Sequence, residues 1–285
     1  METTRFAPSP TGFLHLGHAF SARLGFDAAQ KARGRFLVRI EDIDPARCKP
    51  LFIDAALSDL HFLGLHFPPD VRRQSQHLDD YERALADLHR LGLLYPCFCT
   101  RAEISALAPQ TDSEESFSLY PGRCRALSES EVQGRIDRGE SYALRLNANR
   151  AEAWLRRAGA WPLDFVDERH GTIAVRIEEF GDVVLARKEI RASYHLAVVV
   201  DDALQNVTLV TRGDDLLGAT HVHRVLQALL GLPPPRYAHH RLLLDATGRR
   251  LAKRRGSLSI RALRQQGLTA PQIWAQVGLT DPRKT

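Results

Sequence analysis

The first third of the chain alternates between two hydrophobic periods. Apolar side chains at Phe20, Leu24 and Ala28 recur at the helical spacing and form one hydrophobic face. The run 35–40 is apolar at most positions, which is typical of a buried strand, and it ends at Glu41, where open α/β sheets place ligand-binding groups. The expected elements are strands at Thr4–Ala7 and Arg35–Ile40 and helices at Gly17–Ala32, Phe52–Leu63 and Leu78–Leu91. This alternation predicts an α/β fold with a parallel sheet.

The pattern changes near Cys97, where loops rich in Ser, Pro and Glu alternate with short apolar runs. Strands are expected at Tyr142–Leu146 and Leu163–Val166, then at Tyr194–Val200 and Val207–Val210, where the parallel sheet resumes. A helix is expected over His221–Leu230, and the tail from Leu258 offers one or two short helices. The predicted division is 1–96 and 191–240 for two halves of one parallel-sheet domain, 97–190 for an inserted domain, and 241–285 for the tail.

Composition narrows the range of partners. The formal net charge is +5. Several arginines gather near the end of the chain, at Arg249, Arg250, Arg254, Arg255 and Arg261. This cluster is compatible with a polyanion such as RNA, and a general arginine bias explains it equally well. No apolar run approaches the ~20 residues of a membrane span, and the start of the chain lacks signal-peptide features, so a cytoplasmic protein with no membrane partner is expected.

The sequence from Arg5 to His18 carries the first candidate site. It reads RFAPSPTGFLHLGH, and its prolines and Gly12 exclude a regular helix before residue 13. His15 and His18 would then lie in the first helical turn, where free backbone N–H groups attract phosphate. Imidazoles at this position can donate hydrogen bonds to phosphoryl oxygens as charge develops. Gly17 leaves room for a nucleotide to approach the backbone.

A second basic motif follows far along the chain, from Arg250 to Ser257, and reads RLAKRRGS. Lysine is rare here, and one of the five lysines of the chain, Lys253, lies inside this arginine-rich run. A lysine in such a run indicates a need for a compact ammonium group. With the first motif, it predicts a site that holds a nucleoside triphosphate from two sides.

The four cysteines suggest a metal site rather than disulfides. Cys97 and Cys99 are separated by a single residue, and Cys124 follows the segment Tyr120-Pro-Gly-Arg. Three thiolates suit Zn²⁺, which takes four soft or borderline ligands. The spacing alone leaves the fourth ligand open. Cys48 is expected to be an ordinary thiol.

These motifs resemble a known family. The string from Arg5 to His18 is similar to the HIGH signature of class I aminoacyl-tRNA synthetases in its glutamyl-specific form. The second motif resembles the KMSKS loop of these enzymes, with two departures, Arg250 at the first position and Ala252 in place of the usual serine. The resemblance implies a Rossmann-type parallel sheet with an inserted zinc-binding domain of the acceptor type and a short helical C-terminal segment. It also implies zinc ligation by a pattern that this chain contains in full, at Cys97, Cys99, Tyr120 and Cys124.

The resemblance also implies the residues of the active site. His15, His18 and Lys253 would be catalytic, and with Gly17 they would bind ATP, which brings Mg²⁺. Two carboxylates and an ammonium of a glutamate substrate require a fixed cation and an anion in the pocket. The positions that match the family's glutamate site are Arg5, Phe6, Ala7, Pro8, Ser9, Glu41, Tyr194 and Arg212. Glutaminyl enzymes carry an acidic residue where this chain has Ser9, which favours glutamate.

Fewer than forty residues follow Lys253, which is short for an anticodon-reading domain. This length and the cysteine pattern are similar to the glutamyl-Q tRNA(Asp) synthetase family. The resemblance implies tRNA-independent activation of L-glutamate with ATP, and transfer of glutamate to queuosine at the wobble position of tRNA(Asp). A monomer is expected. The alternatives are a minimal enzyme that charges tRNA(Glu), a catalytically inactive paralogue that binds tRNA, and a zinc-dependent nucleic-acid-binding module.

Overall fold

The computed structural model describes residues 1–107, 120–243 and 258–282. Its first part is a three-stranded parallel sheet in the order β1-β2-β3. The elements are β1 (Thr3–Phe6), α1 (Leu16–Lys31), β2 (Arg35–Ile40), α2 (Pro50–Phe62), β3 (Arg72–Arg73) and α3 (Leu78–Arg90). The predicted strands and helices of this part are confirmed to within two residues.

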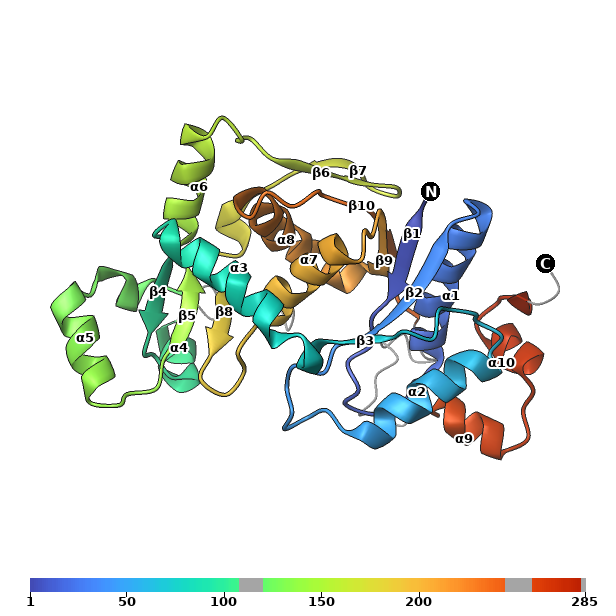
Figure 1. Cartoon of the computed structure of the whole chain (residues 1–285). Helices are drawn as coiled ribbons and strands as arrows, with labels where there is room; N and C mark the ends of the chain where they lie inside the picture. The colour runs from blue at the N-terminus through green and yellow to red at the C-terminus, as the bar shows by residue number, and fades with distance from the viewer. Residues whose placement is uncertain (108–119, 244–257, 283–285) are drawn as a thin grey trace.

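A second sheet has the order β7-β6-β10-β9. Its strands are β6 (Asp164–Asp167), β7 (Gly171–Ala174), β9 (Leu209–Gly213) and β10 (Arg236–His240), and β10 runs parallel to both β6 and β9. The backbone N–H of Thr208, just before β9, donates to the carbonyl of Thr3 over 2.9 Å. The two sheets therefore adjoin along β1 and β9, which lie side by side (Figure 1).

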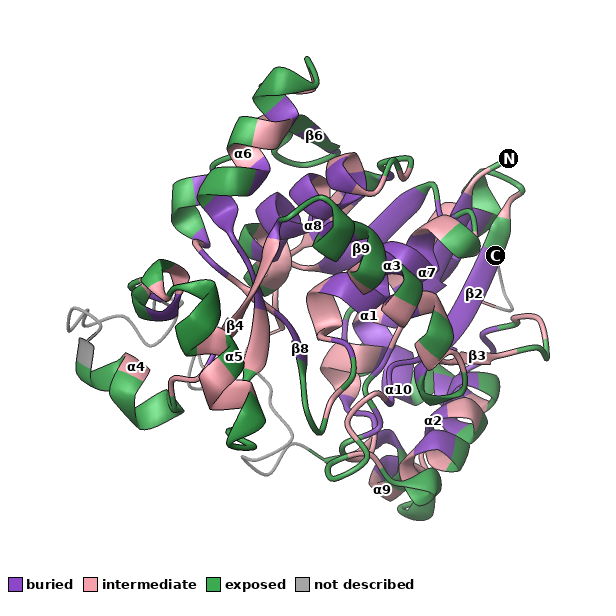
Figure 2. Cartoon of the chain, turned by 60° about the vertical axis from the view of Figure 1, so that its left-hand side comes forward, coloured by how far each residue is buried: buried purple, intermediate pink, exposed green. Residues whose placement is uncertain are grey.

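The predicted strand Tyr194–Val200 is wrong, because this segment forms helix α7 (Tyr194–Leu204). Its side chains from Leu196 to Asp202 are all buried, so the helix lacks the polar face that would give a helical period. The side chain of Ser193 caps its start by accepting from the backbone N–H of Leu196. Helix α7 packs between α3 and α8 (Leu217–Leu229), and Figure 2 shows it in purple, the colour of buried residues.

A third sheet is antiparallel, in the order β4-β5-β8. Its strands are β4 (Leu94–Cys97), β5 (Ala143–Leu146) and β8 (Val184–Arg187), and the helices near it are α4 (Arg101–Leu107), α5 (Glu129–Asp137) and α6 (Ala148–Arg157). All three strands lie within the expected insertion, 97–190, or directly before it. The β6–β7 hairpin also lies within 97–190, yet β6 pairs with β10 at Asp167 and Tyr237. The predicted domain boundaries stay a prediction.

The expected short tail helices are confirmed as α9 (Ile260–Gln265) and α10 (Ala270–Gln276). They pack on the hydrophobic core formed by β1, α1, β2 and α2. Trp274 is fully buried there, and its indole N–H donates to the carbonyl of Leu63 over 3.0 Å. The guanidinium carbon of Arg23 lies 5.3 Å from the Trp274 ring centre. The tail is therefore part of the main core.

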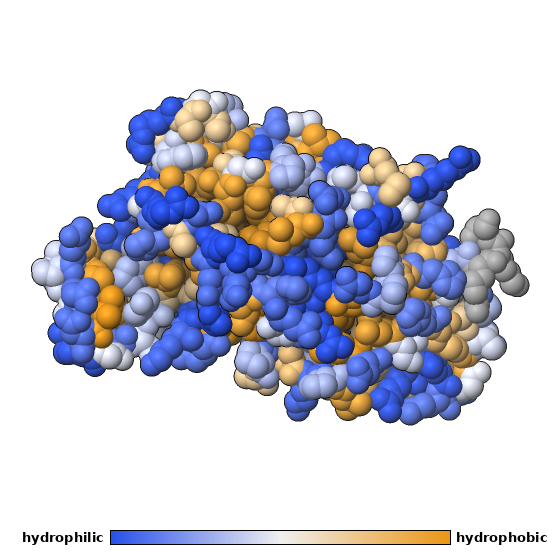
Figure 3. Space-filling model, viewed as in Figure 1, coloured by the Kyte–Doolittle hydropathy of each residue, from blue (hydrophilic) through white to orange (hydrophobic). Residues whose placement is uncertain are grey.

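The outer surface is mostly polar on the face shown in Figure 3. Hydrophobic side chains gather on this face in the upper middle, where α8 lies in Figure 1. Within the described ranges, the helices are all too short or too polar to cross a membrane.

Replacing Trp274 with alanine is expected to lower the free energy of unfolding by about 3–5 kcal/mol, because it removes a large buried side chain and leaves a cavity. Urea denaturation followed by fluorescence or circular dichroism measures this change. The exposed Gln276 on the same helix gives the control, Gln276→Ala, which should change stability by about 0.5 kcal/mol or less. Equal, small effects of both variants would show that the tail is not part of the core.

Candidate active site

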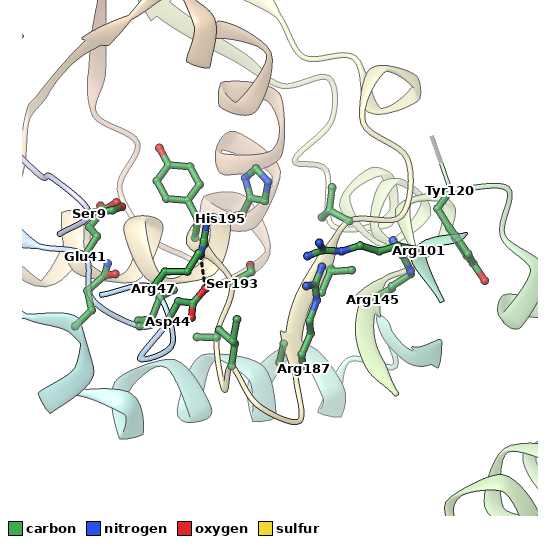
Figure 4. A pocket seen from close by; sticks show the side chains of 18 of the residues that line it. Ser9, Glu41, Asp44, Arg47, Arg101, Tyr120, Arg145, Arg187, Ser193 and His195 are labelled. Carbon is green, nitrogen blue, oxygen red and sulfur yellow. Dashed lines mark hydrogen bonds and ion pairs between the residues drawn. The ribbon is translucent and has the colours of Figure 1, made fainter. Parts of the chain in front are cut away.

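A cavity of about 530 Å³ lies between the parallel strands and the antiparallel sheet. Ser9, Glu41 and His195 line one side of it, and arginines from α4, β5 and β8 line the other (Figure 4). Four of the predicted site residues line this cavity: Ser9, Glu41, Tyr120 and Tyr194. Glu41 follows β2 directly, and Tyr194 begins α7, so chain segments far apart in sequence form the same wall.

The predicted phosphate-binding histidines cap the N-terminus of α1. The backbone N–H of Gly17 donates to Nδ1 of His15 over 3.1 Å, and the backbone N–H of His15 donates to Nδ1 of His18 over 3.2 Å. The two rings lie 3.8 Å apart between centres. Because both rings accept through Nδ1, each neutral imidazole carries its proton on Nε2. A Cβ at position 17 would lie 3.0 Å from the His15 ring, so glycine lets this ring fold over the helix start.

Lys253, with the departures at Arg250 and Ala252, lies outside the described residues. The chain that follows this loop returns to the histidine motif. His15 and Ser259 form an isolated antiparallel bridge, and the backbone N–H of Ile260 donates to the carbonyl of Leu14 over 2.8 Å. Ser259 and Ile260 are thus fixed beside the first turn of α1.

A buried network of charges joins the strand ends to α7. Arg5 donates from Nε to Asp202 over 3.0 Å, and the fully buried Arg39 donates to the same carboxylate oxygen over 2.8 Å. Arg39 also lies 3.4 Å from Glu41 and 3.5 Å from Asp201. Burial raises the pKa of Glu41 to about 7, although Arg39 and Arg5 act in the opposite direction. Burial therefore disfavours the ionised form of Glu41.

Arg212 differs from these arginines because its partners are uncharged. Nε donates to Nε2 of His239 over 3.1 Å, and Nη2 donates to the hydroxyl of Thr220 over 2.6 Å. Nη1 lies 3.1 Å from Nδ1 of His223 and 3.4 Å from the phenol oxygen of Tyr194. Arg212 is only 4 % exposed, and no carboxylate of the described chain forms an ion pair with it. A buried guanidinium without a counter-charge is suited to hold an anionic ligand.

Asp167 determines which nitrogen of His239 accepts the hydrogen bond from Arg212. Its Oδ2 lies 2.7 Å from Nδ1 of His239, so His239 donates through Nδ1 and accepts through Nε2. Burial and the charge of Arg212 lower the pKa of His239 to about 4, despite the hydrogen bond to Asp167. Burial, with a further effect of Arg212, also lowers the pKa of His195 to about 4. These imidazoles are neutral at pH 7 and can accept from a cation.

The sequence analysis missed the polar networks around Arg5 and Arg212, which contain Arg39, Asp167, Asp201, Asp202, His223 and His239. No local motif connects them. Asp167 reaches His239 through the single β6–β10 pairing, across 72 residues of chain. The remaining members of the predicted glutamate set, from Phe6 to Pro8, continue the β1 strand toward the cavity, and the carbonyl of Pro8 accepts from the N–H of Glu41 over 3.1 Å.

The structure brings the predicted metal ligands together. The thiols of Cys97, Cys99 and Cys124 lie within 4.8 Å of one another. The phenol of Tyr120 lies 3.5 Å from the sulfur of Cys99, and the backbone N–H of Phe98 donates to the sulfur of Cys124 over 3.4 Å. Such an N–H group stabilises a thiolate. The cluster could hold a metal ion, and Cys48 lies apart from it, as expected.

Parallel strands that end at a polar cavity, beside a helix N-terminus capped by histidines, define an α/β enzyme of the nucleotide-binding type. Residues 2–279 match the family model of the catalytic domain of class I tRNA synthetases (E and Q). The chain belongs to this family, and it is an ATP-dependent ligase. The predicted class I synthetase fold with a parallel sheet is thereby confirmed.

Several relatives cover most of this chain. The glutamyl-Q tRNA(Asp) synthetase of Rhodobacter capsulatus is 46% identical over an alignment of 285 positions, which covers 97% of this chain and 99% of that protein. The glutamate–tRNA ligase of Hydrogenobaculum sp. is 34% identical over 94% of this chain and 55% of its own length. The crystal structure of glutamate-tRNA synthetase from Elizabethkingia anophelis superposes with a TM-score of 0.72 at 27% identity, over 94% of this chain and 54% of that one.

The neutral state of His239 predicts how stability depends on pH. Its pKa of about 4 in the folded state lies below the ordinary value of 6.5, so the unfolded chain binds more protons between these values. The free energy of unfolding should therefore fall as pH decreases from about 6.5 toward 4, by at most about 1.4 kcal/mol per pH unit from this residue. Urea denaturation at several pH values measures the slope.

His239→Gln should make this slope shallower. The matched control is His66→Gln, at an exposed histidine, which should keep the slope of the original protein. An unchanged slope in the His239 variant would mean that this imidazole is already charged in the folded state.

Proposed function

We propose that the protein activates L-glutamate with ATP and transfers the glutamyl group to queuosine at the wobble position of tRNA(Asp). The observation that carries the proposal is the 46% identity to a glutamyl-Q tRNA(Asp) synthetase over nearly the full length of both chains. Arg212 is buried and pairs with no carboxylate among the residues that the structure describes, which supports an anionic amino-acid substrate. In this proposal the protein is a monomer in the cytoplasm. Its co-substrates are ATP and tRNA.

Glutamate would bind between two groups of opposite charge. Arg212 and the phenol of Tyr194 would receive the side-chain carboxylate, because the hydrogen bond between them brings both to one point of the α7 wall. Glu41 would receive the ammonium group, and this cation would favour its ionised form and so lower the pKa from about 7. The β1 end and the loop after it, with Arg5, Phe6, Ala7, Pro8 and Ser9, would form the floor of the pocket.

Activation would join the α-carboxylate oxygen of glutamate to the α-phosphorus of ATP and release pyrophosphate. His15 and His18 would donate from Nε2 to phosphate oxygens, since their Nδ1 atoms accept backbone N–H groups at the start of α1. Gly17 would let the nucleotide approach the helix, and Lys253 would contribute a positive charge from its loop. The Mg²⁺ that accompanies ATP would supply further positive charge at the phosphates.

Transfer would follow from the bound glutamyl-adenylate, without tRNA in the first step. A hydroxyl of the queuosine cyclopentenediol would attack the carbonyl carbon of the adenylate, form an ester and release AMP. The cavity between the parallel strands and the antiparallel sheet would admit this nucleoside. In this arrangement the residues of the histidine motif act on phosphate, and those at Glu41 and Arg212 hold the amino acid.

The reaction is tested by incubating the protein with ATP, Mg²⁺ and labelled glutamate. Three RNAs are compared: tRNA(Asp) with queuosine, tRNA(Asp) without it, and tRNA(Glu). Label only on the queuosine-containing tRNA(Asp) is expected. Label on tRNA(Glu) would make the protein a charging enzyme, as the 34% identity to a glutamate–tRNA ligase allows. No label and no ATP–pyrophosphate exchange would identify an inactive paralogue.

We further propose that the cluster of Cys97, Cys99, Tyr120 and Cys124 binds one structural Zn²⁺. Three thiols and a phenol supply the four ligands that a closed zinc site requires. The ligands join the end of β4 to the short helical turn Arg123–Ala126, so the metal would hold the start of the antiparallel region in place.

The purified protein should contain one zinc per chain by mass spectrometry of the metal. Cys124→Ser should lose most of this zinc and lower the melting temperature, because the remaining ligands leave the site incomplete. Cys48→Ser removes the one cysteine outside the cluster and should keep both values. A zinc content that is independent of Cys124 would contradict the assignment.

A further inference from the structure

Three arginines meet at the end of the cavity away from Glu41. Arg101 begins α4, Arg145 lies on β5 and Arg187 ends β8, and all three line the cavity. The guanidinium groups of Arg101 and Arg187 lie near each other, opposite Ser9 and Glu41, and Arg145 lies behind them toward Tyr120 (Figure 4). Partial desolvation lowers the pKa of Arg187, although its side chain is exposed at the cavity edge, and the charges of Arg101 and Arg145 lower it further. We call these three residues the arginine cluster.

The arginine cluster carries an excess of positive charge: Glu189 and Asp44 attract Arg187, but less strongly than Arg101 and Arg145 repel it. None of its members forms an ion pair with a carboxylate of the described residues. The two acids that line the cavity nearby are already paired. Asp182 binds Arg125 over 3.1 Å, and Asp44 binds Arg47 over 2.6 Å. Three neighbouring guanidinium groups without a directly paired anion repel one another, and an anionic ligand would relieve this repulsion.

Arg145 is buried and held in place by its neighbours, unlike a mobile arginine on the protein surface. It is 8 % exposed, and its Nε is buried without a hydrogen-bond partner. Nη1 donates to the backbone carbonyl of Asp182 over 2.6 Å, and the guanidinium carbon lies 4.0 Å from the ring centre of Tyr120. These contacts fix the orientation of the guanidinium group in the cavity wall, and its Nε is a buried donor that lacks an acceptor among the described residues.

We propose that the arginine cluster binds phosphodiester groups of the RNA strand that carries the accepting nucleoside. This inference rests on the proposed function, because it places that strand at the opposite end of the cavity from the amino acid. Arginine binds phosphate through parallel N–H donors, which suits a strand that must be held in register. The phosphates of ATP have a separate candidate site at the N-terminus of α1.

The test measures the affinity for tRNA(Asp) by filter binding over a range of salt concentrations. Arg101 and Arg187 are exposed, so Arg101→Ala, Arg187→Ala and the double variant can be made with little risk to folding. Each single variant should weaken binding about tenfold, because a charge-assisted hydrogen bond is lost. Each should also reduce the slope of log affinity against log salt by about 0.7, the value for one contact with a single strand.

Arg138→Ala is the matched control, since it removes the same charge from an exposed arginine that pairs with Glu140 near the start of β5. It should weaken binding less than twofold. Arg145→Lys keeps the charge but loses the planar donors and should weaken binding without reducing the salt slope. Equal effects of the cluster variants and Arg138→Ala would overturn the proposal. A loss confined to the KM for ATP in pyrophosphate exchange would also overturn it and would assign the cluster to pyrophosphate.

The experiments distinguish a failure of the proposed RNA site from a failure of the proposed reaction. If the cluster variants weaken tRNA binding as expected but no glutamate reaches queuosine, the RNA site stands and the proposed reaction is wrong. If queuosine is modified and the cluster variants bind tRNA like the control, the reaction stands and the RNA site is wrong.

Discussion

The structure depends most on the carboxylates at the end of helix α7. Asp202 accepts from Arg5 of β1 and Arg39 of β2, and Asp201 accepts from Tyr81 of α3 and from Arg72 of β3. Two adjacent residues therefore hold three parallel strands and a packing helix, across more than a hundred residues of chain. Buried ion pairs of this kind contribute little net stability, because desolvation offsets their attraction. We infer that their main effect is to fix where the strand ends lie, and so where Glu41 lies.

The two buried arginines of the candidate amino-acid pocket are held in different ways, and this difference matters for binding. Arg5 has its charge balanced by Asp202, so it serves the scaffold. Arg212 is oriented by His239, His223 and Thr220, all of them neutral, so its charge stays available. The low pKa of His239 maintains this arrangement, because a protonated imidazole would repel the guanidinium and could no longer accept its hydrogen bond.

The sequence predicted what depends on local patterns and missed what depends on the fold. The histidine motif, the cysteine pattern and the helix α1 could be recognised because glycine, proline and residue spacing act over a few positions. Helix α7 was mistaken for a strand, because a helix buried on all sides shows the same continuous apolar run as a buried strand. The pairing of Asp167 with His239 could not be predicted, since it depends on the β6–β10 contact between distant segments.

The charges along the cavity suggest how it would separate its ligands. The carboxyl of Glu41 lies on one side and the arginine cluster on the other, so a zwitterion and a polyanion would be drawn to opposite ends. An RNA phosphate near Glu41 would be repelled by that carboxylate once it is ionised, and an ammonium group near the arginines would be repelled by them. Because the ionised form of Glu41 is favoured by a bound ammonium group, the amino acid itself would strengthen this separation before RNA enters. In that order of binding, the amino acid would occupy its end of the cavity before the RNA arrives at the other.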